Sequence, residues 1–203
     1  MVGGGAAEVA VTPDWRARKR AATRARITTA TFALIAERGY ERVSVGDIAT
    51  AAGISVPTFY SYFPSKEHVV LPDQDHTTIA APFTRQPATL PLAERIHRGL
   101  RAMIDTAGPD TRADLLRRWR LVLTVPALRS RSADRENASA AVLLDALGVD
   151  PAGTDTAAEV VVVAASLTAS TTAFLRWAAT DGRRPLEDLV DEAFAALRSI
   201  RED

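Results

Sequence analysis

The feature that most constrains this chain is a pair of short helical patterns on either side of one glycine, between Ser44 and Phe63. Ser44 is followed by Asp47 at the third position, an arrangement resembling a capping box, which favours the start of a helix. Gly53 ends that helix with a turn, because glycine adopts left-handed backbone angles without steric cost. A helix, a glycine turn and a second helix predict a helix-turn-helix, in which the first helix braces the second.

The second helix of this pair has a buried side and an open side. Ser55 can cap its first turn, Pro57 is tolerated just inside that turn, and Pro64 ends the helix. The residues expected to point inward are Ile54, Phe59 and Phe63. The residues expected on or near the open side are Val56, Pro57, Thr58, Tyr60, Ser61 and Tyr62. A helix exposed in this way suits a DNA major groove about 12 Å wide.

A longer helix precedes the pair. Thr12 is its expected N-cap and Pro13 its first residue, where the missing N–H of proline has no helical partner to lose. One face of this helix is formed by Ile27, Thr31, Leu34, Ile35 and Arg38. Gly39 then ends it as a left-handed C-cap. Residues 1–11 have no period and are expected to be a disordered lead-in.

The rest of the chain reads as a succession of Ala-, Leu- and Val-rich helices. A short helix is expected over residues 66–71, and later breaks at Pro82, Pro87, Gly108-Pro109, Pro126, residues 148–153 and Gly182. Residues 155–180 and 185–201 form the clearest pair, expected to be antiparallel. No strand-like alternation competes with these patterns. The predicted fold class is therefore all-α, with a three-helix helix-turn-helix domain over 12–65 and a larger helical domain over 66–203.

The charge is balanced overall but not along the chain. Lys and Arg number 25, as do Asp and Glu, yet residues 1–70 hold nine basic against six acidic side chains. No acid interrupts the basic run Arg16, Arg18, Lys19, Arg20, Arg24 and Arg26. Such a run suits a polyanion such as DNA, although a solvated helix face has the same composition.

The composition excludes several classes of protein. Without cysteine there is no disulfide framework, thiolate metal site or cysteine nucleophile. The sequence shows no uninterrupted run of about 20 apolar residues and no leader pattern at its start. We therefore expect a cytoplasmic protein with no membrane partner.

The stretch RGYERVSVGDIATAAGISVPTFYSYFPSKE resembles the DNA-binding signature of the TetR family, and the similarity extends over residues 16–71. The resemblance implies a dimeric transcriptional repressor that releases double-stranded operator DNA when a small molecule binds. It further implies phosphate contacts from Ser44 and Lys66, and from the hydroxyls of Tyr60 and Tyr62 with Thr58 beside them. The alternative for the two tyrosines is packing beneath a neighbouring helix.

Base reading is expected mainly from Val56, Pro57 and Ser61, because apolar groups suit thymine methyls. Many relatives carry Gly in place of Pro57 and a polar group in place of Val56, so specificity is expected to depend on shape and apolar contact. Ser55, like Ser44, caps a helix, which is compatible with a phosphate contact. The basic run resembles arms that touch the flanking DNA. The arm residues proposed for DNA are Arg16, Arg18 and Arg20.

The stretches RWRLVLTVPALRSR, LLDALGVDP and FLRWAATDGRRPLEDLVDEAFAAL resemble the regulatory domain of a subgroup that includes the mycofactocin-type regulators. The resemblance implies an acyl-CoA-like effector, which needs an apolar tunnel and cations for its phosphates. The expected tail contacts are Leu100, Met103, Leu116, Trp119, Leu123, Phe174 and Trp177. The available cations are Arg117, Arg118, Arg120, Arg129 and Arg131. Ordinary core residues and solvated arginines are the alternative for each.

The last two helices resemble the family's dimerisation hairpin, which implies a four-helix bundle between two copies. The expected dimer residues are Ala165, Ala169, Ala173, Leu189, Ala193, Phe194 and Leu197. This homodimer would present its two recognition helices about 34–36 Å apart, one turn of DNA.

Two other classes of function stay open at this point. An enzyme is disfavoured because the chain has no Gly-x-Ser-x-Gly elbow, no phosphate-binding loop and no His-Glu-x-x-His. A helical ligand-binding or scaffolding protein without DNA binding is the other alternative. Asp73, Asp75 and His76 cluster beside Pro72, where a solvated loop is favoured over a metal site. We expect neither a cofactor nor a metal.

Overall fold

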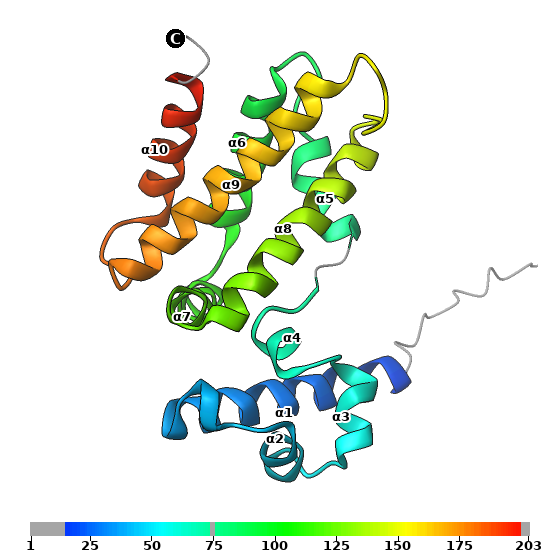
Figure 1. Cartoon of the computed structure of the whole chain (residues 1–203), viewed down its shortest axis with the longest axis vertical. Coiled ribbons are helices and arrows are strands. Elements are labelled where there is room, and N and C mark those ends of the chain that lie inside the picture. Colours follow the sequence, from blue (N-terminus) through cyan, green and yellow to red (C-terminus); the bar gives the residue numbers. More distant parts are fainter. Residues whose placement is uncertain (1–14, 74–75, 200–203) are drawn as a thin grey trace, which may run out of the picture. The chain divides into compact units, whose positions relative to one another are not determined.

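The computed structural model describes residues 15–73 and 76–199 (Figure 1). Every regular element within these ranges is helical, which confirms the all-α fold class. The chain divides into two compact units, the first ending at Val69 and the second beginning at Val70. Each unit has a core of its own, and each is described separately below.

The first unit contains α1 (Trp15–Arg38), the 3-10 turn η1 (Tyr40–Arg42), α2 (Val45–Ala51), α3 (Val56–Tyr62) and most of α4 (Lys66–Val70). Helix α2 packs against both α1 and α3. The core side chains are contributed mainly by Ile27, Phe32, Ile48, Phe59 and Phe63, each at most 4% exposed. The three-helix arrangement thus follows the apolar pattern of the sequence.

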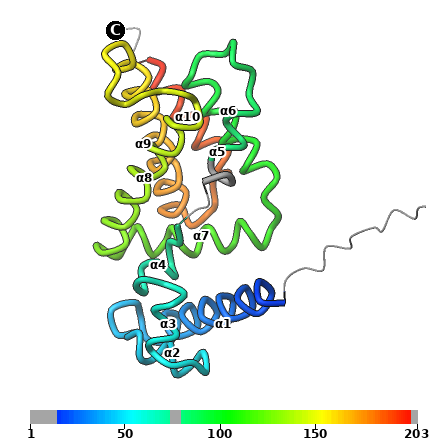
Figure 2. The backbone as a smooth tube through the Cα atoms, turned by 90° about the vertical axis from the view of Figure 1, so that its right-hand side faces the viewer, coloured from blue at the N-terminus to red at the C-terminus, as the bar shows by residue number. Residues whose placement is uncertain are grey.

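The second unit is built from six helices whose bounds are α5 (His76–Thr84), α6 (Leu92–Thr106), α7 (Pro109–Thr124), α8 (Pro126–Ala146), α9 (Ala157–Ala179) and α10 (Leu186–Ser199). Helix α9 lies between α8 and α10 and also packs against α6 and α7 (Figures 1 and 2). It forms the centre of this unit, and α9 and α10 form the expected hairpin.

The local signals for helix ends are confirmed. Ser44 and Asp47 form a complete capping box, and Gly39 and Gly53 have φ angles of 79° and 64°. Pro109 and Pro126 each lie in the first turn of a helix rather than ending one. These positions agree with the physical preferences of proline and glycine.

Pro82 does not end a helix, contrary to the sequence expectation. It lies inside α5, which continues to Thr84. Proline removes only one N–H donor and disturbs the carbonyl four residues earlier, so near the end of a short helix the loss is small. The expected N-cap Thr12 and Pro13 lie outside the described residues.

Helix α9 is long and apolar enough to cross a membrane by length and composition alone, which differs from the expectation drawn from the sequence. Its apolar residues serve the unit's own core in part: Val163, Ala173 and Trp177 are buried. Its other small side chains leave one face of the helix exposed to solvent.

Candidate DNA-binding surface and ligand cavity

Helix α3 has one wholly buried anchor and an open opposite side. Phe59 is 0% exposed, whereas Val56 is 38% and Tyr60 54% exposed. Ser55, Pro57 and Ser61 are also exposed, and Thr58 and Tyr62 are partly buried. Since large hydrophobic side chains are normally covered, an exposed Val56 and Tyr60 on one short helix indicate a contact surface.

The start of α3 is fixed by hydroxyl groups. The backbone N–H of Thr58 donates to Ser55 Oγ at 3.2 Å, and the Ser55 and Thr58 hydroxyls lie 2.7 Å apart. Ser61 Oγ donates to the carbonyl of Thr58 at 2.7 Å. These contacts hold the polar side chains of α3 in defined positions on its open side.

Helix α2 begins at a similarly ordered cap. The N–H of Asp47 donates to Ser44 Oγ at 3.1 Å, and the N–H of Ser44 donates to Asp47 Oδ2 at 2.9 Å. Hydrogen bonds from the Ser44 side chain and backbone hold the pKa of Asp47 below its ordinary value. Ser44 itself is exposed, so its hydroxyl serves the cap while remaining open to solvent.

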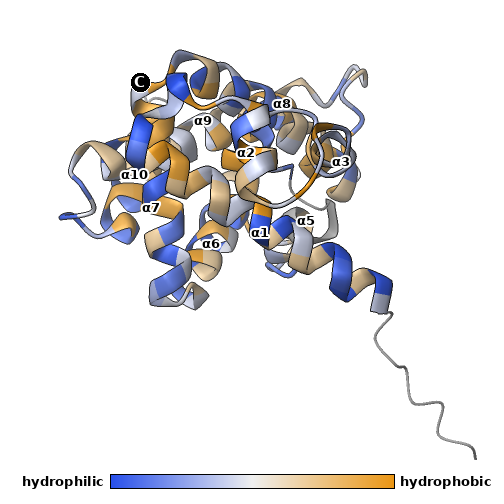
Figure 3. Ribbon diagram, turned by 90° about the horizontal axis from the view of Figure 1, so that it is seen from below, coloured by the Kyte–Doolittle hydropathy of each residue, from blue (hydrophilic) through white to orange (hydrophobic). Residues whose placement is uncertain are grey.

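The basic run is part of α1 and not an arm that precedes a helix. Helix α1 begins at Trp15, and its first turns are strongly hydrophilic (Figure 3). Arg24 Nη1 donates to the Tyr62 carbonyl at 3.0 Å, and Arg20 Nη2 reaches the Ser61 carbonyl at 3.5 Å. The Arg20 guanidinium also lies 5.0 Å from the Tyr62 ring centroid.

These contacts tie α1 to the end of α3. They place Arg20 and Tyr62 in the support of α3, although Arg20 is itself exposed, as are Arg16 and Arg18 on α1. The sequence could not distinguish these roles, because spacing alone does not reveal which arginines of a basic helix face a neighbour.

Lys66 is engaged within the first unit. Its Nζ donates to the carbonyls of Tyr40 and Val43, each at 3.2 Å, and lies 4.2 Å from the Tyr40 ring centroid. Two of its three N–H donors are therefore occupied. Tyr40 Oη donates to Glu67 at 2.6 Å, and burial together with this hydrogen bond raises the pKa of Tyr40 far above its usual range.

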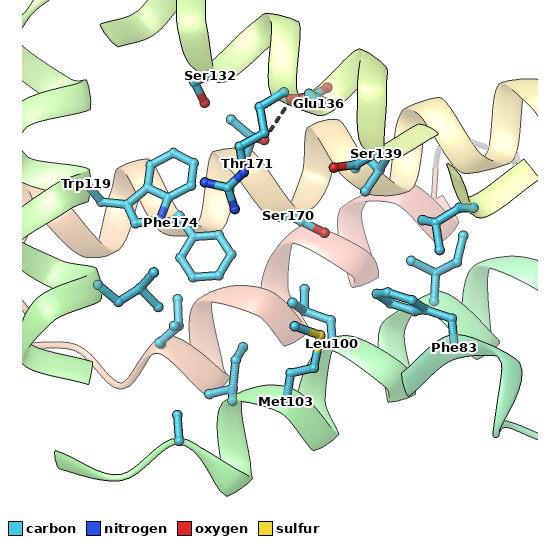
Figure 4. Close-up of a pocket in the computed structure, with 18 of the residues that line it drawn as sticks. Phe83, Leu100, Met103, Trp119, Ser132, Glu136, Ser139, Ser170, Thr171 and Phe174 are labelled. Carbon is cyan, nitrogen blue, oxygen red and sulfur yellow. Dashed lines mark hydrogen bonds between the residues drawn. The ribbon is translucent and has the colours of Figure 1, made fainter. Parts of the chain in front are cut away.

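The second unit contains a partly open cavity of about 330 Å³. Figure 4 shows Trp119 and Phe174 at one end, Phe83 at the other, and Leu100 and Met103 along one side. The Trp119 and Phe174 rings are stacked, with centroids 4.9 Å apart and planes 7° apart. This volume lies within the range of roughly 300–1,000 Å³ that is usual for small-molecule sites.

The wall contributed by α8 and α9 carries polar groups beside apolar ones. It carries Ser132, Arg135, Glu136, Ser139, Ser170 and Thr171. Glu136 accepts hydrogen bonds from Thr168 Oγ1 at 2.5 Å and Thr171 Oγ1 at 2.7 Å. The cavity is therefore amphipathic, with hydroxyl and charged groups facing apolar side chains.

Two models of protein families match the chain. Residues 27–71 match the bacterial regulatory proteins of the tetR family, and residues 90–201 match the MftR C-terminal domain, which is more than half of the chain. The chain belongs to the TetR family. It is a transcriptional regulator with an MftR-type C-terminal domain.

Curated relatives of this TetR-family regulator match over short segments of the chain. The transcriptional regulator EthR of Mycobacterium tuberculosis (strain CDC 1551 / Oshkosh) is 58% identical over 38 residues, 19% of this chain and 18% of EthR. The transcriptional repressor KstR of Rhodococcus jostii (strain RHA1) is 46% identical over 48 residues, 24% of this chain and 23% of KstR. The matches thus span less than a quarter of either relative.

The likeness of fold extends further. The crystal structure of a TetR-family transcriptional regulator from Streptomyces coelicolor aligns with a TM-score of 0.51 and 24% identity, covering 89% of this chain and 82% of that one. The TetR fold is thereby shown for both units.

Four of the seven expected tail contacts line the cavity, namely Leu100, Met103, Trp119 and Phe174 from α6, α7 and α9. The other three, Leu116, Leu123 and Trp177, are not among the lining residues. None of the five expected cations lines it either, namely Arg117, Arg118, Arg120, Arg129 and Arg131. Arg120 forms an ion pair with Asp181. Apolar periodicity identifies the inner face of a helix, but not whether that face meets a cavity or another side chain.

The polar residues of α8 were missed by sequence reasoning. A signal was present, because Leu128, Ser132, Arg135, Ser139 and Leu143 recur at helical spacing. Four of these five are buried. An arginine on an otherwise inward-facing stripe is uncommon, since charged side chains are rarely buried without a partner.

The dimer residues expected on α9 and α10 occupy two environments. Ala173, Leu189 and Phe194 are at most 1% exposed within one chain, so they belong to its own core and not to a face for a second copy. The partly buried members of the set are Ala165, Ala169, Ala193 and Leu197. The exposed side of α9 carries Ala157, Ala158, Val161, Ala164, Thr168 and Thr172. An apolar helix covered on two sides gives no sequence signal for which side is outermost.

Side chains that would serve catalysis or metal binding do not converge in the described ranges. His68 Nδ1 lies 2.9 Å from Ser65 Oγ, and His97 Nε2 lies 2.7 Å from Asp191 Oδ1. Asp73 pairs with Arg131, whereas Asp75 lies outside the described residues. Among the residues that the structure describes, no group of three His, Cys, Asp or Glu side chains could hold a metal ion.

Proposed function

We propose that this regulator is a repressor that binds a palindromic operator as a homodimer and is released by a small hydrophobic or acyl-CoA-like effector. The observation that carries the proposal is the open side of α3, where Val56 and Tyr60 are exposed opposite a wholly buried Phe59. A helix anchored on one side and open on the other suits insertion into a major groove.

The roles proposed on DNA follow from exposure. Val56, Pro57 and Ser61 are the proposed base contacts, and Tyr60 and Thr58 the proposed phosphate contacts beside them. The proposed contacts flanking α3 are Ser44, Ser55, Tyr62, Lys66, Arg16, Arg18 and Arg20. Most of these contacts position the protein, whereas specificity depends on the few base contacts and on DNA shape.

The amphipathic cavity supports an effector site in the second unit. Its aromatic and aliphatic lining suits an apolar tail, and its volume is sufficient for a small molecule. The MftR-type domain that contains it matches residues 90–201. Effector and operator would then bind different conformations of the regulator, and each would weaken the other by the same factor.

A connection between the cavity and the start of the second unit supports this coupling. Arg118 Nη1 donates to the Val70 carbonyl at 2.5 Å, and Arg131 Nε reaches the Leu71 carbonyl at 3.4 Å. Arg118 comes directly before the cavity residue Trp119 on α7, and Arg131 comes directly before the cavity residue Ser132 on α8. The boundary between the units falls within α4, so residues 70–73 are the segment through which a change in the cavity would be transmitted.

The test is a gel-shift titration with DNA from upstream of the regulator's own gene, together with mass spectrometry of small molecules that co-purify. We expect a retarded complex at low salt whose stoichiometry is two chains per site, and its loss when the extracted molecule is returned. Failure to retard this DNA at low salt would contradict the proposal.

A further inference from the structure

Arg135 is an arginine in the cavity wall that forms no ion pair with any residue that the structure describes. It lies on α8 among the residues that line the cavity, and it is partly buried. Within the described part of the chain, no carboxylate or carbonyl forms an ion pair or hydrogen bond with its guanidinium. Burial lowers the pKa of Arg135 to about 10, and the neighbouring cations of Arg131 and Arg118 act in the same direction. The side chain is still positively charged at neutral pH.

The other cavity arginine is different. Arg112 donates to the carbonyls of Ile104 at 2.7 Å and Ala107 at 3.1 Å, and its Nη2 lies 2.5 Å from Glu187 Oε1. These contacts satisfy the Arg112 side chain within the fold. Arg135 has five N–H donors in a planar fork that matches a carboxylate, and no described residue accepts a hydrogen bond from them.

The arginines next to Arg135 have ion-pair partners among the described residues, whereas Arg135 has none. Arg118 pairs with Asp114 at 2.5 Å, and Arg131, one helical turn before Arg135, pairs with Asp73. The nearest carboxylate on α8, Glu136, is held by hydroxyls of α9. Burying a charge without a partner is unfavourable, so a site of this kind favours a ligand that brings a single negative charge.

The size and lining of the cavity define the rest of the ligand. A cavity of 150 Å³ holds benzene, so a cavity of about 330 Å³ holds on the order of a dozen non-hydrogen atoms. The Trp119–Phe174 stack, Leu100 and Met103 offer apolar surface beside the polar groups of α8 and α9 (Figure 4). A slender chain with one acidic end meets both requirements.

We propose that the cavity binds a carboxylic acid with an unbranched apolar tail of about ten carbons, whose carboxylate pairs with the Arg135 guanidinium. This rests on the proposed function, in that the cavity is taken as the effector site. The tail lies against the aromatic pair and the α6 side chains, and the acid itself is the effector without a coenzyme attached.

The experiment is isothermal calorimetry on the full chain at pH 7 with decanoate and with decanamide, which has the same tail and no charge. We expect decanoate to bind roughly tenfold to a hundredfold more tightly, the range for a charge-assisted hydrogen-bonded pair. In the variant Arg135→Met we expect the two ligands to bind equally. Arg129→Met, on the exposed side of the same helix, retains the preference for the acid.

Arg135→Met is also expected to raise the unfolding midpoint of the ligand-free protein, because it removes a buried charge without a partner. Continued binding of decanamide shows that the variant is folded. Equal affinities for the two ligands in the unmodified protein would overturn the proposal. So would an acid preference that survives Arg135→Met.

The outcomes separate this inference from the proposed function. Should decanoyl-CoA release DNA while decanoate does not bind, the acid ligand is wrong and the ligand-responsive repressor stands. Should decanoate bind through Arg135 without weakening DNA binding, the acid site stands and the proposed release of DNA by an effector in this cavity is wrong.

Discussion

At the scale of single residues, Arg24 is the side chain that most directly supports α3. Its Nη1 donates to the Tyr62 carbonyl at 3.0 Å, and its guanidinium lies 4.2 Å from the Phe63 ring centroid. We expect Arg24→Ala to lower the free energy of local opening around α3 by about 1–2 kcal/mol. Amide hydrogen exchange of α3 measures this change. Arg26→Ala, at an exposed position on the same helix, is the control, and equal effects of both variants would contradict the assigned role.

Residue identities alone predicted the caps but not the partners of the charged side chains. Ser44, Gly39 and Gly53 were predictable because their roles depend on backbone geometry within a few residues. The sequence did not predict the roles of Arg20, Lys66 and Arg135. The role of each depends on groups that are distant in the sequence or on a cavity. Burial of an arginine without a partner is a property of the folded chain only.

At the scale of the elements, the N-terminus of α2 combines a helix cap with a proposed phosphate contact. Ser44→Ala removes the cap, and we expect a loss of about 1 kcal/mol in stability. Ser44→Asp retains a good cap but adds a negative charge where a phosphate is proposed to bind. Thermal unfolding should therefore be affected mainly by alanine. DNA affinity should be reduced by aspartate as well, and unchanged affinity in Ser44→Asp would remove Ser44 from the interface.

Helix α10 is tied to α7 by the ion pair between Glu187 and Arg112, which makes stability depend on pH. The hydrogen bond from Arg112 holds the pKa of Glu187 below its ordinary value. The native state then binds fewer protons than the unfolded state near pH 4, so the free energy of unfolding falls as pH falls. The contribution is complete above the unfolded-state pKa of about 4.3 and is lost as pH drops through the lower native value.

Urea unfolding at a series of acidic pH values measures this effect. We expect Glu187→Gln to have a shallower dependence of stability on pH than the unmodified protein. Glu192→Gln on the same helix is the matched control: Arg184 lowers the pKa of Glu192 too, but this pair is exposed and contributes less. An acid profile of Glu187→Gln identical to that of the unmodified protein would contradict the assignment.

The elements themselves were largely predictable from the sequence. The α9–α10 hairpin follows the apolar pattern on either side of Gly182 and Pro185, and α3 follows Ser55 and Pro64. Pro82 was misjudged because its effect depends on how much helix follows it. The inner and outer faces of α9 were not separable, because both are made of small or apolar residues.

At the scale of the whole molecule, the basic start of α1 should determine how DNA affinity depends on salt. Arg16 and Arg18 are exposed on α1, and each phosphate neutralised contributes about 0.9 to the slope of log affinity against log salt. We expect the double variant Arg16→Ala, Arg18→Ala to flatten the slope of log affinity against log salt. The expected change is about 2 for each chain of the dimer in which both arginines contact phosphate. Arg129→Ala, in the second unit, should leave the slope unchanged. An unaltered slope in the double variant would exclude these arginines from the interface.

The central claim is that the open side of α3 reads the operator. Fluorescence anisotropy of labelled DNA from upstream of the regulator's own gene, with unlabelled random duplex as competitor, tests it most directly on Tyr60→Ala. Because Tyr60 is 54% exposed, this variant should remain as stable as the unmodified protein while its affinity falls at least tenfold, about 1.4 kcal/mol. Undiminished affinity in Tyr60→Ala, or binding by the unmodified protein that random DNA competes away equally well, would contradict the account.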